Sequence, residues 1–106
     1  MTTFDKREEA FERQFAHDEE LKFKAEARRN RLLGLWAADR LGKRGAEADA
    51  YAKEVVTADF DEPGHAGVLG KVLRDLTAKG IAVTESDVRA KMSELLVTAV
   101  AQVKGT

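Results

Sequence analysis

The chain has 106 residues, of which 43% are apolar, a net charge of −1 and no cysteine. This length predicts one domain with one hydrophobic core, and the lack of cysteine excludes a disulfide framework and a thiolate metal site. No apolar run approaches the roughly 20 residues that cross a bilayer. Because alanine is frequent, proline occurs once and no run alternates in polarity, we expect an all-α fold.

The first segment, about residues 3–16, predicts a helix with one narrow apolar edge. At 100° per residue, Phe4, Phe11 and Phe15 fall within about 40° of one another, and charged residues occupy the rest of the circumference. Such an edge buries little by itself, so the segment either packs on its own domain or binds in the groove of a partner. Lipid binding is disfavoured because acidic residues outnumber basic ones on the polar face.

A second helix is expected from about Glu19 to Leu41, after a break at His17 and an N-cap at Asp18. Its apolar residues cover two sides, which is typical of the central helix of a bundle. Gly34 costs the helix up to about 1 kcal/mol relative to alanine, so we expect it to pack closely on a neighbour. The two expected packing faces are Leu21, Ala25, Leu32 and Trp36, and Phe23, Ala27, Gly34, Ala38 and Leu41.

Three more helices are expected over about residues 46–60, 65–79 and 85–103, joined by short connections. Gly42 and Gly80 can take the left-handed conformation that ends a helix, and Thr84 with Asp87 has the spacing of a capping box. We therefore expect a four-helix bundle over residues 19–106, with residues 1–18 as an N-terminal amphipathic arm. The expected inward residues are Ala48, Tyr51, Ala52, Val55, Val56, Phe60, Val68, Leu69, Val72, Leu73, Leu76, Val88, Met92, Leu95, Leu96, Ala99 and Val103.

Charge is segregated along the chain: residues 1–20 carry −4 and residues 21–44 carry +6. Lys24, Arg28 and Arg31 are spaced i, i+4 and i+7, so they form one basic ridge on the second helix. A solvated cationic face, held by the acidic segments on either side, is the commonest meaning of such a ridge. Phosphate binding is the second interpretation, and nucleic-acid binding is disfavoured by the net charge.

Nothing in the sequence indicates catalysis or metal binding. His17 and His65 both lie in polar connections, without a second histidine at ligand spacing. The carboxylates lie on solvated helix faces, and no pair is placed for divided acid and base roles. We therefore expect a protein that is not an enzyme and binds no metal.

The stretch from residue 21 to 45 reads LKFKAEARRNRLLGLWAADRLGKRG, preceded by FERQFAHDEE and followed by AYAKEVVTADF. Together these segments closely resemble the alphaproteobacterial zeta subunit, a small inhibitor of the F-type ATP synthase, and the resemblance covers essentially the whole chain. It implies a cytoplasmic regulator, monomeric when free, that binds the catalytic head at the inner membrane. In that family the N-terminal arm enters an interface between the alpha and beta subunits near gamma and blocks rotation in the hydrolytic direction.

The resemblance also implies roles for individual residues and a regulatory ADP or ATP ligand. Neither nucleic acid nor membrane insertion is expected of such a protein. The alternative function, from another class, is a small non-enzymatic module that binds nucleotides or anions. The partner-binding residues expected on the arm are Phe4, Arg7, Glu8, Phe11, Arg13 and Phe15, and those expected to bind nucleotide are Lys24, Arg28, Arg29, Arg31 and Trp36.

Overall fold

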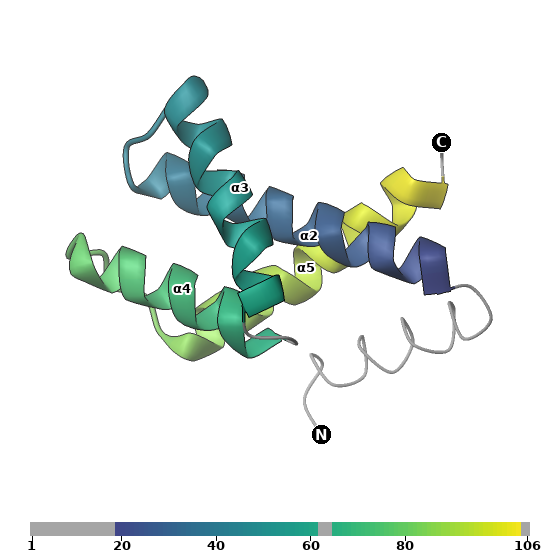
Figure 1. Cartoon of the computed structure of the whole chain (residues 1–106). Helices are drawn as coiled ribbons and strands as arrows, with labels where there is room; N and C mark the ends of the chain where they lie inside the picture. Colours follow the sequence, from purple (N-terminus) through teal and green to yellow (C-terminus); the bar gives the residue numbers. More distant parts are fainter. Residues whose placement is uncertain (1–18, 62–64, 105–106) are drawn as a thin grey trace.

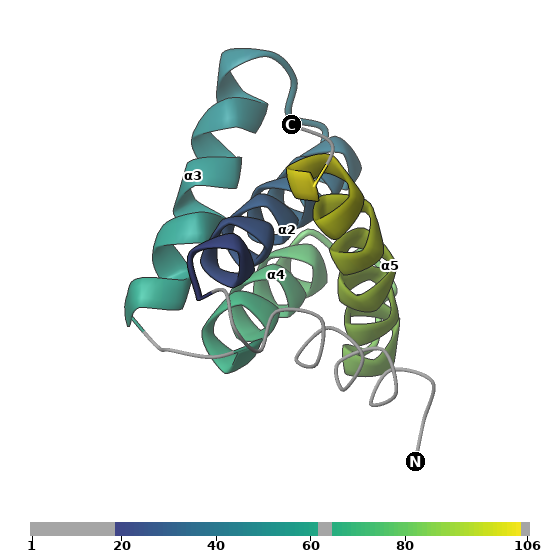
Figure 2. The same ribbon diagram turned by 90° about the vertical axis from the view of Figure 1, so that its right-hand side faces the viewer.

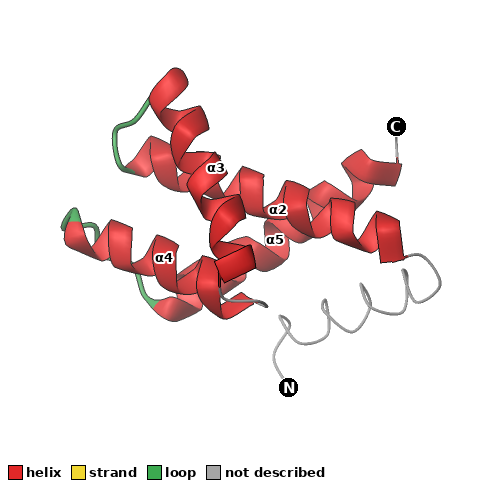
Figure 3. Ribbon diagram, in the orientation of Figure 1, coloured by secondary structure: helices red, strands yellow, loops and turns green. Residues whose placement is uncertain are grey.

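The computed structural model describes residues 19–61 and 65–104, which form four helices and, within these ranges, no strand (Figure 3). The expected all-α fold is confirmed. The predicted arm, residues 1–18, lies outside the described residues. The helices are α2 (Glu19–Arg40), α3 (Ala46–Asp61), α4 (His65–Ala78) and α5 (Glu85–Lys104).

Helix α2 is the central element, as its two apolar sides predict. It packs against α3, α4 and α5, and α4 also contacts α3 and α5. Along the chain, each helix reverses the left–right direction of the helix before it (Figure 1). Viewed along α2, α3 and α5 lie on its two sides and α4 lies beneath it (Figure 2). Among the described helices, none covers the outer side of α2 between α3 and α5.

The core is contributed by all four helices, and most residues expected to face inward do so. Ala48, Val56, Leu73 and Leu95 are only half-buried, and the side chain of Phe60 is outside the described set. The main cluster consists of Leu33, Ala37, Ala38, Tyr51, Val55, Val68, Leu69, Val72, Leu76, Val88 and Met92. A smaller cluster of Ala25, Leu96 and Val103 joins the first half of α2 to the end of α5.

The signals for helix ends in the sequence are confirmed in atomic detail. Gly80 has φ +87°, and the amide of Ile81 donates to the carbonyl of Leu76 over 3.0 Å, which folds the chain back onto α4. At the start of α5, the Thr84 amide donates to Asp87 Oδ2 (2.9 Å) and the Asp87 amide donates to Thr84 Oγ1 (3.1 Å). This reciprocal pair is a capping box with aspartate in the third position.

The two glycines of the α2 region have the roles expected of them. Gly34 packs directly on α3: a Cβ built there would lie 2.6 Å from the Cα of Ala52. Gly42 has φ +80°, and the amide of Lys43 donates to the carbonyl of Ala38 over 2.9 Å, which ends α2. The close contact at Gly34 allows α2 and α3 to approach each other with almost no space between their backbones.

The buried face of α2 differs from the predicted one. Phe23, expected on a packing face, is 57% exposed, whereas Leu33, which was assigned to no face, is completely buried. Arg29 and Asn30 are also buried, with exposed fractions of 3% and 1%. Because apolar residues lie on more than one side of α2, its sequence does not select one face, and the positions of α3 and α5 decide which side is covered.

Candidate functional site

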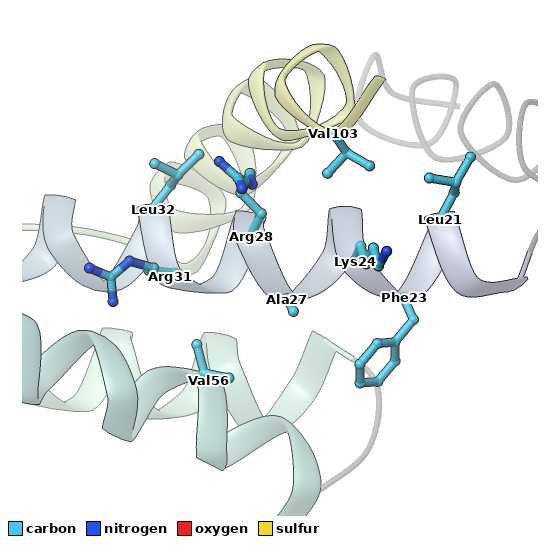
Figure 4. Close-up of a pocket in the computed structure, with 9 residues that line it drawn as sticks. All are labelled: Leu21, Phe23, Lys24, Ala27, Arg28, Arg31, Leu32, Val56 and Val103. Carbon is cyan, nitrogen blue, oxygen red and sulfur yellow. The ribbon is translucent and has the colours of Figure 1, made fainter. Parts of the chain in front are cut away.

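An open hollow of about 630 Å³ lies on the outer side of α2, between α3 and α5, and we call it the α2 groove (Figure 4). Seven of its nine lining residues come from α2, with Val56 from α3 and Val103 from α5. Its volume is within the range of small-molecule sites, roughly 300–1,000 Å³. The lining residues are Leu21, Phe23, Lys24, Ala27, Arg28, Arg31, Leu32, Val56 and Val103.

Among its described lining residues, the α2 groove combines an apolar floor with cationic side chains. Six of the nine lining residues are apolar, three are basic and none is acidic. In Figure 4 the ring of Phe23 and the side chain of Ala27 lie on the α3 side, near Val56, while Arg28 extends toward α5. A ligand that carries both an apolar part and negative charge is therefore complementary to this surface.

Each cation of the groove already has one weak polar partner. The three interactions, two ion pairs and one hydrogen bond to a neutral amide, lie at the protein surface, where exposed ion pairs contribute about 0–1 kcal/mol. An anion that enters the groove can therefore replace them at little cost in free energy. The partners are Glu20 Oε1 for Lys24 (3.3 Å), Gln102 Oε1 for Arg28 (3.1 Å) and Asp49 Oδ1 for Arg31 (3.5 Å).

The structure places the two other expected nucleotide-binding residues away from the groove. Arg29 is buried, and its Nε donates to the Oδ1 of Asn30 over 3.0 Å. Trp36 lines a separate hollow between α2 and α5, where Arg40 and Lys91 lie 5.0 and 5.8 Å from its ring centroid. Three of the five expected residues are thus brought together, and the spacing of i, i+4 and i+7 was the signal that found them.

Comparison with known protein families gives a match over nearly the whole chain. The matching family is described as ATPase inhibitor subunit zeta, and the match extends over residues 1–102. The chain belongs to this zeta family. The family is alphaproteobacterial and inhibitory, so its members regulate an ATPase rather than catalyse a reaction, and the resemblance seen in the sequence is confirmed.

A solved structure shares the fold of this chain. The chain is 55% identical to a protein whose structure was solved in solution by NMR, and the two structures superpose with a TM-score of 0.70. The alignment covers 80% of this chain and 96% of the other. Comparison with curated proteins found no significant match. The family match includes residues 1–18, and therefore all six expected partner-binding residues, although these lie outside the residues that the structure describes.

A polar cluster that the sequence did not predict links α3 to α4 in this zeta protein. The hydroxyl of Tyr51 donates to Asp75 Oδ2 over 2.8 Å, and Lys71 Nζ lies 3.1 Å from the same oxygen and 3.5 Å from Glu54 Oε1. Burial, reinforced by the hydrogen bond to the Asp75 carboxylate, raises the pKa of Tyr51 well above its ordinary value. A phenol held protonated in this way stabilises the contact of the two helices and is not available as a base.

Among the described residues we find neither a metal-binding cluster nor a membrane-spanning helix. Within residues 19–61 and 65–104, no group of three His, Cys, Asp or Glu side chains is close enough to hold a metal ion. None of the four described helices is both long and apolar enough to cross a membrane. His65 is the first residue of α4, and His17 lies outside these ranges.

Proposed function

We propose that this chain inhibits ATP hydrolysis by the F-type ATP synthase through its N-terminal arm. The arm, residues 1–18, enters an interface between the alpha and beta subunits near gamma and blocks rotation in the hydrolytic direction. The observation that carries the proposal is the zeta-family match, which extends over residues 1–102 and so includes the arm as well as the helical body.

The sequence of the arm suits this role. Phe4, Phe11 and Phe15 share one edge of a helix and supply apolar anchors of the kind that dominate binding energy at interfaces. Arg7, Glu8 and Arg13 lie on the polar side, where charge pairs fix the orientation of a bound helix more than they add affinity. The arm therefore carries both the apolar anchors and the orienting charges that insertion between two subunits requires.

The helical body contributes a regulatory nucleotide site in the α2 groove. Lys24, Arg28 and Arg31 bind the phosphates of ADP or ATP, and the adenine lies on the apolar floor beside Phe23 and Val56. The cationic charge of the groove, whose described lining residues include no acid, supports this part of the proposal. The same observation favours the second candidate function, a nucleotide- or anion-binding regulatory module without an enzyme target.

The test is ATP hydrolysis by the catalytic head of the synthase, measured with increasing amounts of three versions of the chain. The full chain should inhibit, and a chain that starts at Glu19 should not. Phe11→Ala in the full chain should weaken binding by about 1 kcal/mol or more, because a buried aromatic anchor is lost. Val97→Ala is the matched control, because Val97 is 58% exposed on α5 and distant from the arm in sequence.

Two outcomes would contradict the proposal in different ways. Equal inhibition by the full chain and the chain that starts at Glu19 would remove the arm from the mechanism. No inhibition by any version would overturn the inhibitory function and leave the binding module as the better description. Neither outcome depends on nucleotide binding in the α2 groove, which is tested separately.

A further inference from the structure

We propose that the α2 groove binds nucleotide in its magnesium-free form and discriminates against the magnesium complex. This selectivity rests on the proposed nucleotide site, whose ligand it narrows to one ionic form of ADP or ATP. Among the described lining residues, the polar side-chain atoms are the nitrogen donors of Lys24, Arg28 and Arg31, and none is an oxygen.

The side chains that line the groove offer hydrogen-bond donors and no acceptor. Ammonium and guanidinium groups donate but have no acceptor capacity, and the six other lining residues are leucine, phenylalanine, alanine and valine. The backbone carbonyls of residues 21–32 accept from the amides four positions further on, because α2 continues to Arg40. Along the described part of α2, the groove therefore presents positive charge without an oxygen ligand that is ready for a metal ion.

Magnesium bound to a nucleotide needs the opposite surroundings. Mg²⁺ takes oxygen ligands and keeps several of its waters, and each of these waters donates hydrogen bonds outward. In kinases and nucleotide hydrolases, carboxylate, amide or hydroxyl oxygens of the protein hold the ion. The cations of the α2 groove can neither ligate Mg²⁺ nor accept from its waters, and they repel its charge.

The charge of the ligand favours the same form. Free ADP carries about −3 at pH 7.5 and its magnesium complex about −1, because the phosphate groups are almost fully ionised there. The three cations of the groove match the charge of the free nucleotide. Mg²⁺ also occupies the phosphate oxygens that arginine binds with two parallel donors, so the ion and the cations compete for the same atoms.

The acids next to the groove do not form a magnesium site. Glu20 Oε1 lies 3.3 Å from Lys24 Nζ and Asp49 Oδ1 lies 3.5 Å from Arg31 Nη2, so each carboxylate is paired with a different cation. Lys24 and Arg31 are about 10 Å apart along α2, whereas the ligands of Mg²⁺ all lie about 2.1 Å from it. Over residues 19–61 and 65–104, no three His, Cys, Asp or Glu side chains are grouped closely enough to hold a metal ion.

Selection of the free form separates the groove from catalytic sites that hydrolyse ATP. Those sites use the magnesium complex, in which the metal bridges phosphate oxygens and neutralises the developing charge. The α2 groove and a catalytic site therefore bind different forms of the same nucleotide. Occupancy of the groove should rise when the ratio of nucleotide to Mg²⁺ rises, even if the total nucleotide concentration stays constant.

The test compares ADP binding to the full chain in EDTA and in excess MgCl₂. Amide shifts of residues 21–32 report on the groove, and NaCl is added to the EDTA sample to match ionic strength, because salt alone screens exposed charges. Excess Mg²⁺ should weaken ADP binding about threefold to thirtyfold, the effect of losing two exposed charge contacts. MgCl₂ without nucleotide should shift none of these signals.

A carboxylate placed in the groove should remove the discrimination. Ala27 lies on the α3 side of the groove, near Val56 (Figure 4), and Ala27→Asp supplies an oxygen ligand for Mg²⁺. Free ADP should bind this variant more weakly, while excess Mg²⁺ should no longer weaken binding. Ala90→Asp makes the same exchange in the separate hollow beside Trp36 and should leave the magnesium effect unchanged.

The possible outcomes separate the selectivity from the proposed function. Because Ala27 is half-buried, circular dichroism checks that the variant folds, and the comparison in the unchanged chain decides the selectivity by itself. Equal or tighter ADP binding in MgCl₂ would overturn the selectivity and leave the nucleotide site in place. No shift of residues 21–32 in either condition would overturn both. Loss of inhibition of the catalytic head, with weaker binding in MgCl₂, would overturn the inhibitory function alone.

Discussion

Gly34 of α2 lies against the backbone of Ala52 in α3, so closely that a Cβ on Gly34 would come within 2.6 Å of the Ala52 Cα and within 3.3 Å of the Val55 Cβ. Backbone atoms in a packed helix cannot move aside independently, in contrast to the end of a long side chain. The contact between α2 and α3 therefore depends on the absence of a side chain at this position.

Gly34→Ala should destabilise the protein by about 1–2 kcal/mol. Overpacking of a close contact costs about 1–3 kcal/mol, and the better helix propensity of alanine returns up to about 1 kcal/mol. Gly70→Ala is the matched control, because Gly70 lies inside α4 with no atom within 4 Å of a built Cβ. It should be neutral or stabilising by up to about 1 kcal/mol. Urea unfolding measures both, and equal effects would contradict the backbone contact.

Thr84→Ala should destabilise the protein by about 1 kcal/mol, because it removes the side-chain acceptor for the Asp87 amide at the start of α5. Ser86→Ala, at an exposed position of the same turn, should have little effect. A double-mutant cycle with Asp87→Ala should show coupling, since the two residues form one reciprocal pair. Additive losses of free energy would show that the two hydrogen bonds act independently.

Stability should fall at high pH because of Tyr51. Its pKa is raised by burial and by the hydrogen bond to Asp75, whereas the pKa of tyrosine in an unfolded chain is about 10. The folded state therefore favours the protonated phenol, and this stabilisation is complete below about pH 10 and lost as the pH rises further.

Absorbance of the tyrosinate measures this directly, since Tyr51 is the only tyrosine of the chain. The titration should lie above that of the urea-unfolded protein, and Asp75→Asn should lower the pKa of Tyr51 toward its usual range. Coincident titrations of the folded and unfolded chains would show that the phenol is not held by Asp75. Glu47→Gln, at an exposed position at the start of α3, is the control for the loss of one negative charge.

ADP should shift the amide signals of residues 21–32 while leaving the fluorescence of Trp36 unchanged. Trp36 is the only tryptophan and lies in a different hollow from the groove. Arg28→Ala and Arg31→Ala should each weaken ADP binding about threefold to tenfold, since each removes a charged donor at an open site. Arg40→Ala, which removes a cation over Trp36, is the control. Quenching of Trp36 without shifts in residues 21–32 would place the nucleotide elsewhere.

The helices and their ends could be predicted because their signals are local. The Gly80 helix end extends over six residues, Leu76 to Ile81, and the Thr84–Asp87 pair over four, so the local sequence contains each whole interaction. Gly34 was predictable for a related reason, since a glycine inside a helix is costly unless a neighbour needs the space. The partner of Gly34, Ala52, could not be predicted, because nothing local specifies which helix approaches.

The candidate site was only partly predictable. The spacing of Lys24, Arg28 and Arg31 is enough to place them on one side of a helix, and the structure adds the apolar floor that only tertiary packing creates. Arg29, one residue from Arg28, is turned by about 100° and is buried. Trp36 belongs to a contact with α5, and its cation partner Lys91 is 55 positions away in the chain, beyond the reach of a local pattern.

The position of α2 among the other helices has a consequence for how the protein opens. Helices α3, α4 and α5 all pack on α2. Local unfolding of any one of them therefore exposes only part of α2, and the other two still cover the rest. Backbone amides in the middle of α2 should consequently be the slowest in the chain to exchange with deuterium. The cationic ridge of Lys24, Arg28 and Arg31 therefore belongs to the helix that we expect to unfold last. Its side-chain spacing should be retained when the ends of the other helices fray.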